Sequence, residues 1–357
     1  MALEPIRTIQ VNTTPAYTVS IGSGLLQKSG TLLQDILGLC HVAVITDSTV
    51  APLYLDTVAG SLREAGFPVS TYVFPAGEAH KNMATLSDIL EFLARERLTR
   101  TDCIVALGGG VCGDMAGFAA ATFLRGIRYV QLPTTVLSAV DSSVGGKTAI
   151  DLKAGKNLAG AFLQPAAVLC DTDCLASLPP AIFADGVAEA IKTGVLADEE
   201  LFTLFEGGTL TTAPAEVISR CVAYKAGVVE RDEKEQGERK LLNLGHTVGH
   251  AIEKCSSFTI SHGHAVAAGL AIMARAAEHL GWAEEPLAGR IAACLEKNHL
   301  PIGTTYSAEE LTAAASADKK RTGSDITLVV PQRIGKCSLR KIPVENLFTV
   351  ISAGLEG

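Results

Sequence analysis

The sequence predicts an N-terminal α/β domain with a parallel, doubly wound (Rossmann-like) sheet, followed by a mainly α-helical domain. Two observations carry this prediction. In the first half of the chain, short apolar runs alternate with helical patterns of about 10–15 residues, as in βαβ units. After Leu178-Pro179-Pro180, long segments rich in Ala, Leu and Glu replace this alternation. We therefore expect two domains, at residues 1–175 and 176–357.

The expected strands of the first domain are short runs rich in Val, Ile and Leu, typical of strands buried on both faces of a parallel sheet. Between them, apolar residues recur at helical spacing. The strands span Tyr17–Ile21, Val42–Thr46, Ser70–Phe74, Cys103–Leu107, Tyr129–Leu132 and Ala167–Cys170, and the helices span Val50–Ala65, Met83–Glu96 and Val111–Thr122.

The second domain is expected to be helical because its apolar residues repeat with helical spacing over long segments. Two late runs, Ile326–Val330 and Lys336–Leu339, are extended in pattern and predict a hairpin. The expected helices span Ala181–Leu196, Ala215–Asp232, His246–Lys254, His262–Leu280 and Glu285–His299.

Composition excludes several classes of protein. With 48% hydrophobic and 19% charged residues, the chain is not disordered, and its net charge of −8 argues against nucleic-acid binding. Mean hydropathy is +0.29, but the most apolar stretch, Cys103–Leu124, contains Asp114 and five glycines, so no membrane span is expected. The first residues show no apolar core of a secretory signal, and the nine cysteines have no regular spacing. We expect a cytoplasmic protein with free cysteines.

A glycine-rich loop follows the predicted strand Cys103–Leu107. Gly108, Gly110 and Gly113 satisfy G-x-G-x-x-G between a strand and a helix, where backbone N–H groups approach a pyrophosphate. The acidic residue expected about 20 residues later is absent, so tight strand–helix packing remains the alternative. The motif favours phosphate or dinucleotide binding in an arrangement other than the usual one.

Polar residues also follow neighbouring predicted strands: Asp47, Glu78 with Lys81, and Thr134-Thr135. Each alone is typical of a turn or a helix cap. Because the carboxyl ends of parallel strands share one edge of a sheet, the set as a whole favours a dinucleotide.

The segment Asp141–Thr148 ends in Gly-Gly-Lys-Thr but has Asp141 where a P-loop needs its first glycine, which argues against nucleotide hydrolysis. Lys147, Lys153, Lys156 and Asn157 follow among glycines. Flexible backbone with point charges suits an anionic substrate, and a solvated loop with surface lysines is the alternative.

Four of the eight histidines, His246, His250, His262 and His264, lie close together in the sequence. His246 and His250 are four residues apart and share a helix face. Glu189, in an apolar helical segment, offers an oxygen ligand, although pairing with Lys192 would also explain it. Two histidines and one carboxylate form an open catalytic zinc set. Spacing alone does not decide which histidines coordinate the metal.

The chain contains a set of motifs in a fixed order between about residues 40 and 340. They are Gly77-Glu78-x-x-Lys81, Gly108–Asp114, Phe123-Leu124-Arg125-Gly126, Pro133-Thr134-Thr135, Val140–Lys147, Gly155-Lys156-Asn157, Glu189-x-x-Lys192, Asp232-Glu233-x-Glu235-x-Gly237-x-Arg239 and Leu242-Asn243-x-Gly245-His246-Thr247-x-Gly249-His250. Together they resemble the 3-dehydroquinate synthase family of the sugar-phosphate cyclases.

The resemblance implies an NAD-binding domain, a zinc-binding domain (with cobalt as an alternative metal) and a homodimer. The implied zinc ligands are Glu189, His246 and His262. Implied NAD contacts are Asp47, Glu78, Lys81, Gly110, Val111, Gly113, Asp114, Thr134, Thr135, Lys147, Lys156, Cys174 and Ser177. Implied catalytic and substrate residues are Asp141, Lys147, Asn157, Lys192, Lys225, Arg239, Asn243, His250 and Lys336, with Arg125 reaching a neighbouring subunit's site.

The implied reaction converts 3-deoxy-D-arabino-heptulosonate 7-phosphate, a phosphorylated keto acid, to 3-dehydroquinate and phosphate in the shikimate pathway. It proceeds by transient oxidation by NAD, phosphate elimination, reduction and aldol closure, with His250 expected to carry protons. One departure is His264, where the family commonly has Glu. The alternatives are another cyclase such as a 2-deoxy-scyllo-inosose synthase, a metal-dependent polyol dehydrogenase, or a non-catalytic NAD- or metal-binding protein. Lys147 and Arg239 favour a substrate with a carboxylate.

Overall fold

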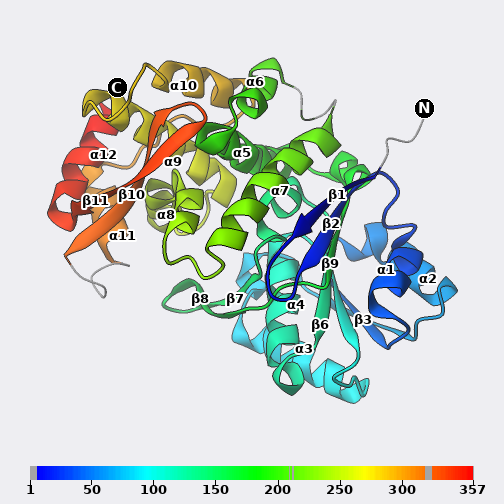
Figure 1. The fold of residues 1–357 in the computed structure, drawn as a ribbon. Helices are drawn as coiled ribbons and strands as arrows, with labels where there is room; N and C mark the ends of the chain where they lie inside the picture. The colour runs from blue at the N-terminus through cyan, green and yellow to red at the C-terminus, as the bar shows by residue number, and fades with distance from the viewer. Residues whose placement is uncertain (1–5, 209, 211–212, 318–323, 357) are drawn as a thin grey trace. The chain divides into compact units, whose positions relative to one another are not determined.

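A computed structural model describes residues 6–208, 210, 213–317 and 324–356 (Figure 1). The chain divides into two compact units, Met1–Leu178 with Lys225–Lys234, and Pro179–Tyr224 with Glu235–Gly357. Helix α7, Pro214–Arg231, contributes residues to both units. The first unit also includes Lys225–Lys234, and the expected division into domains at residues 1–175 and 176–357 stays a prediction.

The first unit contains a seven-stranded sheet in the order β1-β2-β9-β6-β5-β3-β4. Every neighbouring pair is parallel except β1 and β2. All the strands expected from the sequence are present, and β1 is an additional one. The strands are β1 Arg7–Val11, β2 Tyr17–Gly22, β3 Val42–Asp47, β4 Val69–Phe74, β5 Cys103–Gly108, β6 Arg128–Pro133 and β9 Ala167–Asp171.

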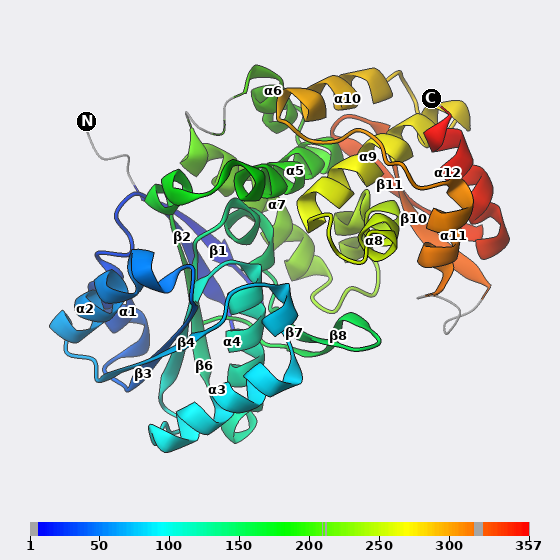
Figure 2. The same ribbon diagram turned by 180° about the vertical axis from the view of Figure 1, so that it is seen from behind.

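Helices cover both faces of this sheet, which confirms the doubly wound fold (Figures 1 and 2). Successive strand residues point to opposite faces. Val44 therefore packs in one apolar core with Leu33 of α1, whereas Ile45 packs in the other with Ile89 of α3. The helices are α1 Ser29–Leu37 and α2 Asp56–Glu64 on the first face, and α3 Met83–Arg95 and α4 Gly110–Thr122 on the second. The helix expected over Val50–Ala65 begins as a π-helical segment, Ala51–Leu55, before α2.

The order of connections reverses between β3 and β5. After β3 the chain forms β4 on one side, and then crosses to build β5 and β6 on the other side. Ligands of open α/β sheets bind at such a switch point, beyond the carboxyl ends of the strands. Asp47 ends β3 and Gly108 ends β5, so both lie at this position.

The segment after Gly146 that carries Lys147, Lys153 and Lys156 is a two-stranded antiparallel hairpin, β7 Lys147–Leu152 and β8 Gly155–Phe162, and not a loop, although Lys147 and Lys153 are exposed. Thr148 and Ile150 are buried on alternate positions of β7, and α4 packs beside this strand. The glycines and lysines around them conceal this period of two in the sequence.

The second unit is mainly helical, as expected, with the predicted hairpin near the end of the chain. Helix α9 packs against α5 and α8, and an apolar core joins α8 and α9 to the hairpin and to α12 (Figure 2). Among the described residues, no helix is both long and apolar enough to span a membrane. The elements, besides α7, are α5 Pro180–Ala197, α6 Glu199–Gly207, α8 His246–Cys255, α9 His262–His279, α10 Ala288–Lys297, α11 Ala308–Ala317, β10 Asp325–Arg333, β11 Lys336–Pro343 and α12 Leu347–Leu355.

Candidate functional site

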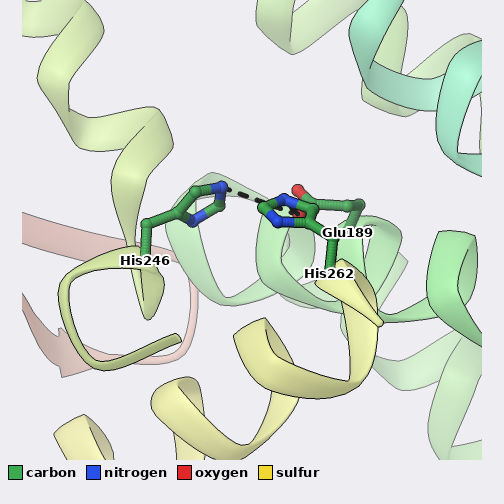
Figure 3. Close-up of side chains that lie close together, drawn as sticks. All are labelled: Glu189, His246 and His262. Atoms are coloured by element: carbon green, nitrogen blue, oxygen red, sulfur yellow. Dashed lines mark ion pairs between the residues drawn. The ribbon is translucent and has the colours of Figure 1, made fainter. Parts of the chain in front are cut away.

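Three side chains of the second unit converge on one point. Glu189 comes from the middle of α5, and His246 and His262 are the first residues of α8 and α9 (Figure 3). Oε1 of Glu189 lies 3.4 Å from Nε2 of His262 and 3.7 Å from Nε2 of His246. Two ligand atoms in tetrahedral positions around one zinc ion lie about 3.3 Å apart, given zinc–ligand bonds of about 2.0–2.2 Å. The three ligand atoms are therefore spaced to hold one metal ion.

The second ring nitrogen of each histidine faces an acceptor. Nδ1 of His246 lies 3.0 Å from the carbonyl oxygen of Leu244, and Nδ1 of His262 lies 3.1 Å from Oε2 of Glu253. With a metal bound, a proton on Nδ1 would satisfy each acceptor and leave the lone pair of Nε2 available to the metal. This orientation by a carbonyl or carboxylate is typical of metal-binding histidines. Glu253 was not predicted from the sequence.

The charges around Glu189 also suit a cation. Its side chain is only 1% exposed, and Oε1 has no hydrogen-bond donor of good geometry among the described residues. Burial alone would raise the pKa of Glu189, but the charge of Lys192, which contacts Oε2, holds that pKa well below its usual value. The Glu189–Lys192 pair considered from the sequence is thus present together with the histidines. An ionised, buried oxygen facing two imidazoles fits a metal ligand.

The pKa values of His246 and His262 are shifted in opposite directions. Burial, followed by Lys192, lowers the pKa of His246 to about 3, so its imidazole is neutral. Burial acts against the charged form of His262, but Glu189 and Glu253 outweigh it and raise the pKa of His262 to about 10. A positive charge between two carboxylates is what a divalent ion would supply at this position.

The other two histidines of the cluster have different surroundings. The ring of His250 lies 5.3 Å from that of His246 and 5.8 Å from that of His262, measured between centroids. His250, Glu253 and His262 form a second set of possible ligands, which shares His262 with the first. Nδ1 of His264 lies 2.7 Å from Oδ1 of Asp185, so His264 is bound by that carboxylate and is not part of either set.

In the first unit, the hairpin brings predicted residues to the segment after β4. Nζ of Lys81 donates hydrogen bonds of 2.6 Å to Oδ2 of Asp114 and to Oδ1 of Asn157. Nζ of Lys156 lies 3.8 Å from Oε1 of Glu78. Burial opposes the charge on Lys81, but Asp114 and Glu78 outweigh it and raise the pKa of Lys81. These five side chains, all predicted, form one polar cluster.

Asp151 fixes this cluster and was not predicted. Its backbone N–H donates to the carbonyl oxygen of Lys81 at 2.8 Å, and its Oδ1 accepts from the N–H of Asn157 at 2.8 Å. Burial raises the pKa of Glu78 despite the nearby cations Lys81 and Lys156. Asp151 thus holds the hairpin against the loop that carries Glu78 and Lys81.

Strand β5 and helix α4 pack tightly at the glycine loop, which is the alternative that the sequence left open. A Cβ on Gly108 would lie 2.6 Å from Cβ of Cys112, so only glycine permits α4 to begin directly after β5. The N–H of Thr134 donates to the carbonyl oxygen of Gly108 at 3.0 Å, and Oγ1 of Thr135 lies 2.8 Å from Oγ of Ser138. The predicted residues Gly110, Val111, Gly113 and Asp114 occupy the first turns of α4.

Asp47 and Cys174, which lie at or just after strand ends, accept hydrogen bonds from nearby residues. Oδ1 of Asp47 accepts from the N–H groups of Thr49 and Val50 at 2.8 and 3.0 Å. This oxygen therefore stabilises the turn after β3, which is the alternative to cofactor binding that the sequence left open. The carbonyl oxygen of Cys174 accepts from Oη of Tyr54 at 3.3 Å and from Oγ of Ser177 at 2.9 Å. The thiol of Cys174 is buried, and Tyr54 was not predicted.

The remaining predicted residues lie as follows. Arg239 is 1% exposed, a buried cation in the segment before α8, and Arg125 has a positive φ of 70° after α4. Lys147 begins β7. Nζ of Lys225 lies 2.8 Å from Oδ1 of Asp141, Nδ2 of Asn243 donates to Glu235 at 2.7 Å, and Nζ of Lys336 lies 2.5 Å from Glu284 on the surface.

Comparison with known proteins extends over nearly the whole chain. Residues 71–185 match the family profile of the 3-dehydroquinate synthase N-terminal domain, and residues 186–321 match that of its C-terminal domain. A crystal structure of 2-deoxy-scyllo-inosose synthase with carbaglucose-6-phosphate, NAD+ and Co2+ is 25% identical, with a TM-score of 0.84 over 98% of this chain and 100% of that one.

A second similar structure is 2-epi-5-epi-valiolone synthase from Streptomyces hygroscopicus subsp. jinggangensis 5008, with NAD+ and Zn2+ bound. It is 26% identical, with a TM-score of 0.85 over 95% of this chain and 96% of that one. Glycerol dehydrogenase from Schizosaccharomyces pombe, at 16% identity and a TM-score of 0.62 over 93% of this chain and 87% of that one, shares the fold alone. The chain belongs to the 3-dehydroquinate synthase family of sugar-phosphate cyclases.

Proposed function

We propose that this protein is a 3-dehydroquinate synthase, a phosphate-eliminating lyase that converts 3-deoxy-D-arabino-heptulosonate 7-phosphate to 3-dehydroquinate. The observation that supports this most is the group Glu189, His246 and His262, in which Nε2 of both histidines faces one buried carboxylate oxygen. Both family profiles that match the chain describe 3-dehydroquinate synthase. The product would enter aromatic amino-acid synthesis through the shikimate pathway.

NAD+ and a divalent metal, zinc or cobalt, are the proposed cofactors. The two similar cyclase structures contain NAD+ together with Co2+ or Zn2+. When bound, NAD+ supplies reversible hydride acceptance and the metal supplies Lewis acidity. Glu189, His246 and His262 would hold the metal, since their ligand atoms have suitable spacing and charge.

The dinucleotide would bind at the switch point of the sheet. Asp47 lies at the end of β3 there, and the first turn of α4 offers N–H groups and a favourable dipole to a pyrophosphate. Lys81, fixed by Asp114 and Asn157, supplies a positively charged group beside Glu78. The remaining proposed NAD contacts are Gly110, Val111, Gly113, Thr134, Thr135, Lys147, Lys156, Cys174 and Ser177.

An acidic substrate would suit a site lined by cations in a chain of net charge −8. Arg239 is buried, and its planar guanidinium binds a carboxylate in two-point fashion better than any other side chain. Lys147 and Lys192 would add charge for the carboxylate and phosphate groups. A neutral polyol or a hexose phosphate would leave Arg239 with no substrate carboxylate to bind.

Proton transfer is assigned to His250. Its ring lies beside both proposed histidine ligands, and an imidazole can both accept and donate a proton. The other proposed substrate contacts are Asp141, Asn157, Lys225, Asn243 and Lys336, and Arg125 is proposed to reach the site of a second copy in a homodimer.

The test supplies purified protein with zinc, 3-deoxy-D-arabino-heptulosonate 7-phosphate and NAD+ far below the substrate concentration. Because the hydride is taken and returned in each cycle, we expect many phosphates released per NAD+ and no accumulation of NADH. Absence of phosphate release would contradict the proposal, and NADH formed in proportion to substrate would indicate a dehydrogenase instead.

A 2-deoxy-scyllo-inosose synthase is the second candidate, favoured by the similarity to the solved structure of that enzyme. The same assay with glucose 6-phosphate distinguishes the two. Phosphate release from glucose 6-phosphate but not from the heptulosonate phosphate would establish the second candidate.

A further inference from the structure

The start of helix α9 is capped by a residue from a different helix. Ser261 precedes α9 in extended backbone, the usual place of a capping side chain, but its side chain accepts no capping hydrogen bond within the described structure. Its hydroxyl instead donates to Oδ1 of Asp185, on α5, at 2.6 Å. The same oxygen accepts from the backbone N–H of His264 at 3.0 Å and lies 2.7 Å from Nδ1 of His264.

The two helices touch at this point through their backbones. A Cβ on Gly263 would lie 2.2 Å from the carbonyl oxygen of Asp185 and 2.3 Å from its Cα. No side chain fits there, so glycine permits the first turn of α9 to rest directly on α5. The Asp185 side chain is only 11% exposed, whereas Ser261 is exposed and the His264 side chain is 27% exposed, so the carboxylate is shielded from water at the edge of the junction.

This junction includes one proposed metal ligand, His262, and lies one helical turn from another, Glu189. Glu189 follows Asp185 by four residues on α5, and His262 lies between Ser261 and Gly263. A cap from the preceding loop would stabilise α9 alone, whereas a carboxylate from α5 fixes α9 relative to the helix that carries Glu189. Glu189 Oε1 and His262 Nε2, 3.4 Å apart, lie on the two helices that this contact joins.

We propose that Asp185 is a positioning residue for the metal centre: it joins α5 to α9 and so sets the geometry between Glu189 and His262. The proposal rests on the proposed function, in which these residues hold the metal. His264, which stands where the family commonly has Glu, takes part as a partner of Asp185 and not as a ligand.

The test measures Co2+ binding, because the visible absorption of Co2+ reports coordination geometry independently of turnover. Metal-free protein is titrated with Co2+ against a competing chelator, for the wild type, Asp185→Ala and Asp185→Asn. We expect Asp185→Ala to bind Co2+ about 10–100-fold more weakly, as when other supports of metal ligands are removed, with a changed absorption spectrum. Asp185→Asn keeps an oxygen acceptor for Ser261 and the N–H of His264, so it should restore most of the affinity and the wild-type spectrum.

A matched control separates positioning from general stability. Asp198 caps α6 in the same unit by accepting from the N–H of Leu201 at 2.9 Å, and it also pairs with Arg220 at 3.1 Å. Asp198→Ala should lower the melting temperature yet leave Co2+ affinity and spectrum unchanged. If Asp185→Ala does not fold, Ser261→Ala, which removes one donor to Asp185, should weaken Co2+ binding in the same direction by a smaller factor.

The outcomes distinguish this inference from the proposed function. Wild-type protein that binds no Co2+ overturns both. Wild-type protein that binds Co2+ tightly, together with an Asp185→Ala variant of equal affinity and identical spectrum, overturns the positioning role alone. Equal weakening by Asp185→Ala and Asp198→Ala also overturns it, because the effect would then follow from stability.

Discussion

Replacing Lys81 by methionine removes a buried charge and keeps a side chain of similar length. Lys81 is 5% exposed and Asp114 19% exposed, and their charged atoms are 2.6 Å apart. Breaking a fully buried pair costs about 3–5 kcal/mol because the remaining charge has no partner. Since Asp114 retains some access to water, we expect a loss at the lower end, about 3 kcal/mol.

The loss is measured as a shift in melting temperature. At about 2–4 °C per kcal/mol for a domain of this size, we expect Lys81→Met to melt about 6–12 °C below the wild type. Lys156→Met serves as the matched control, since the Lys156–Glu78 pair is longer, at 3.8 Å, and more exposed. A pair of that kind contributes about 0–1 kcal/mol, so its removal should change melting by only a few degrees. Equal shifts in the two variants would refute the reasoning.

The stability difference between Lys81→Met and the wild type should depend on pH through Asp114. Burial already raises the pKa of Asp114, and loss of Lys81 raises it further. A carboxyl group whose pKa is higher in the folded protein than in the unfolded chain stabilises the fold when protonated, and that contribution is lost as pH rises. The difference in stability between Lys81→Met and the wild type should therefore shrink as the pH falls. A difference that grows on acidification would show that Asp114 is not the group affected.

Three further outcomes follow from the site and the sheet. Glu253→Ala should weaken Co2+ binding about 10–100-fold, because Nδ1 of His262 loses its acceptor, and Glu253→Gln should restore most of it. Gly108→Ala should lower the free energy of unfolding by about 1–3 kcal/mol, measured by thermal melting. Gly289→Ala, with open space around its Cβ in α10, should be neutral or stabilising, and equal losses would contradict the packing argument. Removal of the metal with a chelator, or His246→Ala, should abolish turnover and keep the circular dichroism of the fold, whereas full activity without metal would exclude the ligand assignment.

Buried strands were the most predictable part of the fold. The runs Val42–Ile45 and Cys103–Leu107 are apolar throughout because both faces of a parallel sheet are covered. Strand β1 was missed because it lies at the sheet edge and is largely exposed, with a polar sequence. The hairpin at Lys147–Phe162 was missed because its glycines and lysines conceal the alternation of buried residues.

The candidate site was predictable where residue type and spacing carry chemistry. The histidine cluster and Glu189 were noted from residue type and spacing, whereas the choice of His246 and His262 as ligands came from the resemblance to the family. The groups that orient the site were not predicted: Glu253 lies seven residues after His246, on the same face of α8, and this spacing is the one sequence feature that points to it. Asp185 contacts residues 76–79 positions away in the sequence, and no local pattern reports such a contact.

The central claim is a phosphate-eliminating cyclisation of an acidic sugar phosphate, and substrate preference tests it most directly. The measurement is kcat/KM for phosphate release from 3-deoxy-D-arabino-heptulosonate 7-phosphate and from glucose 6-phosphate, with the same zinc-loaded protein and catalytic NAD+. The buried Arg239 predicts a strong preference for the carboxylate-bearing substrate, and Arg239→Lys should reduce it. A preference for glucose 6-phosphate, unaffected by Arg239→Lys, would contradict the assignment.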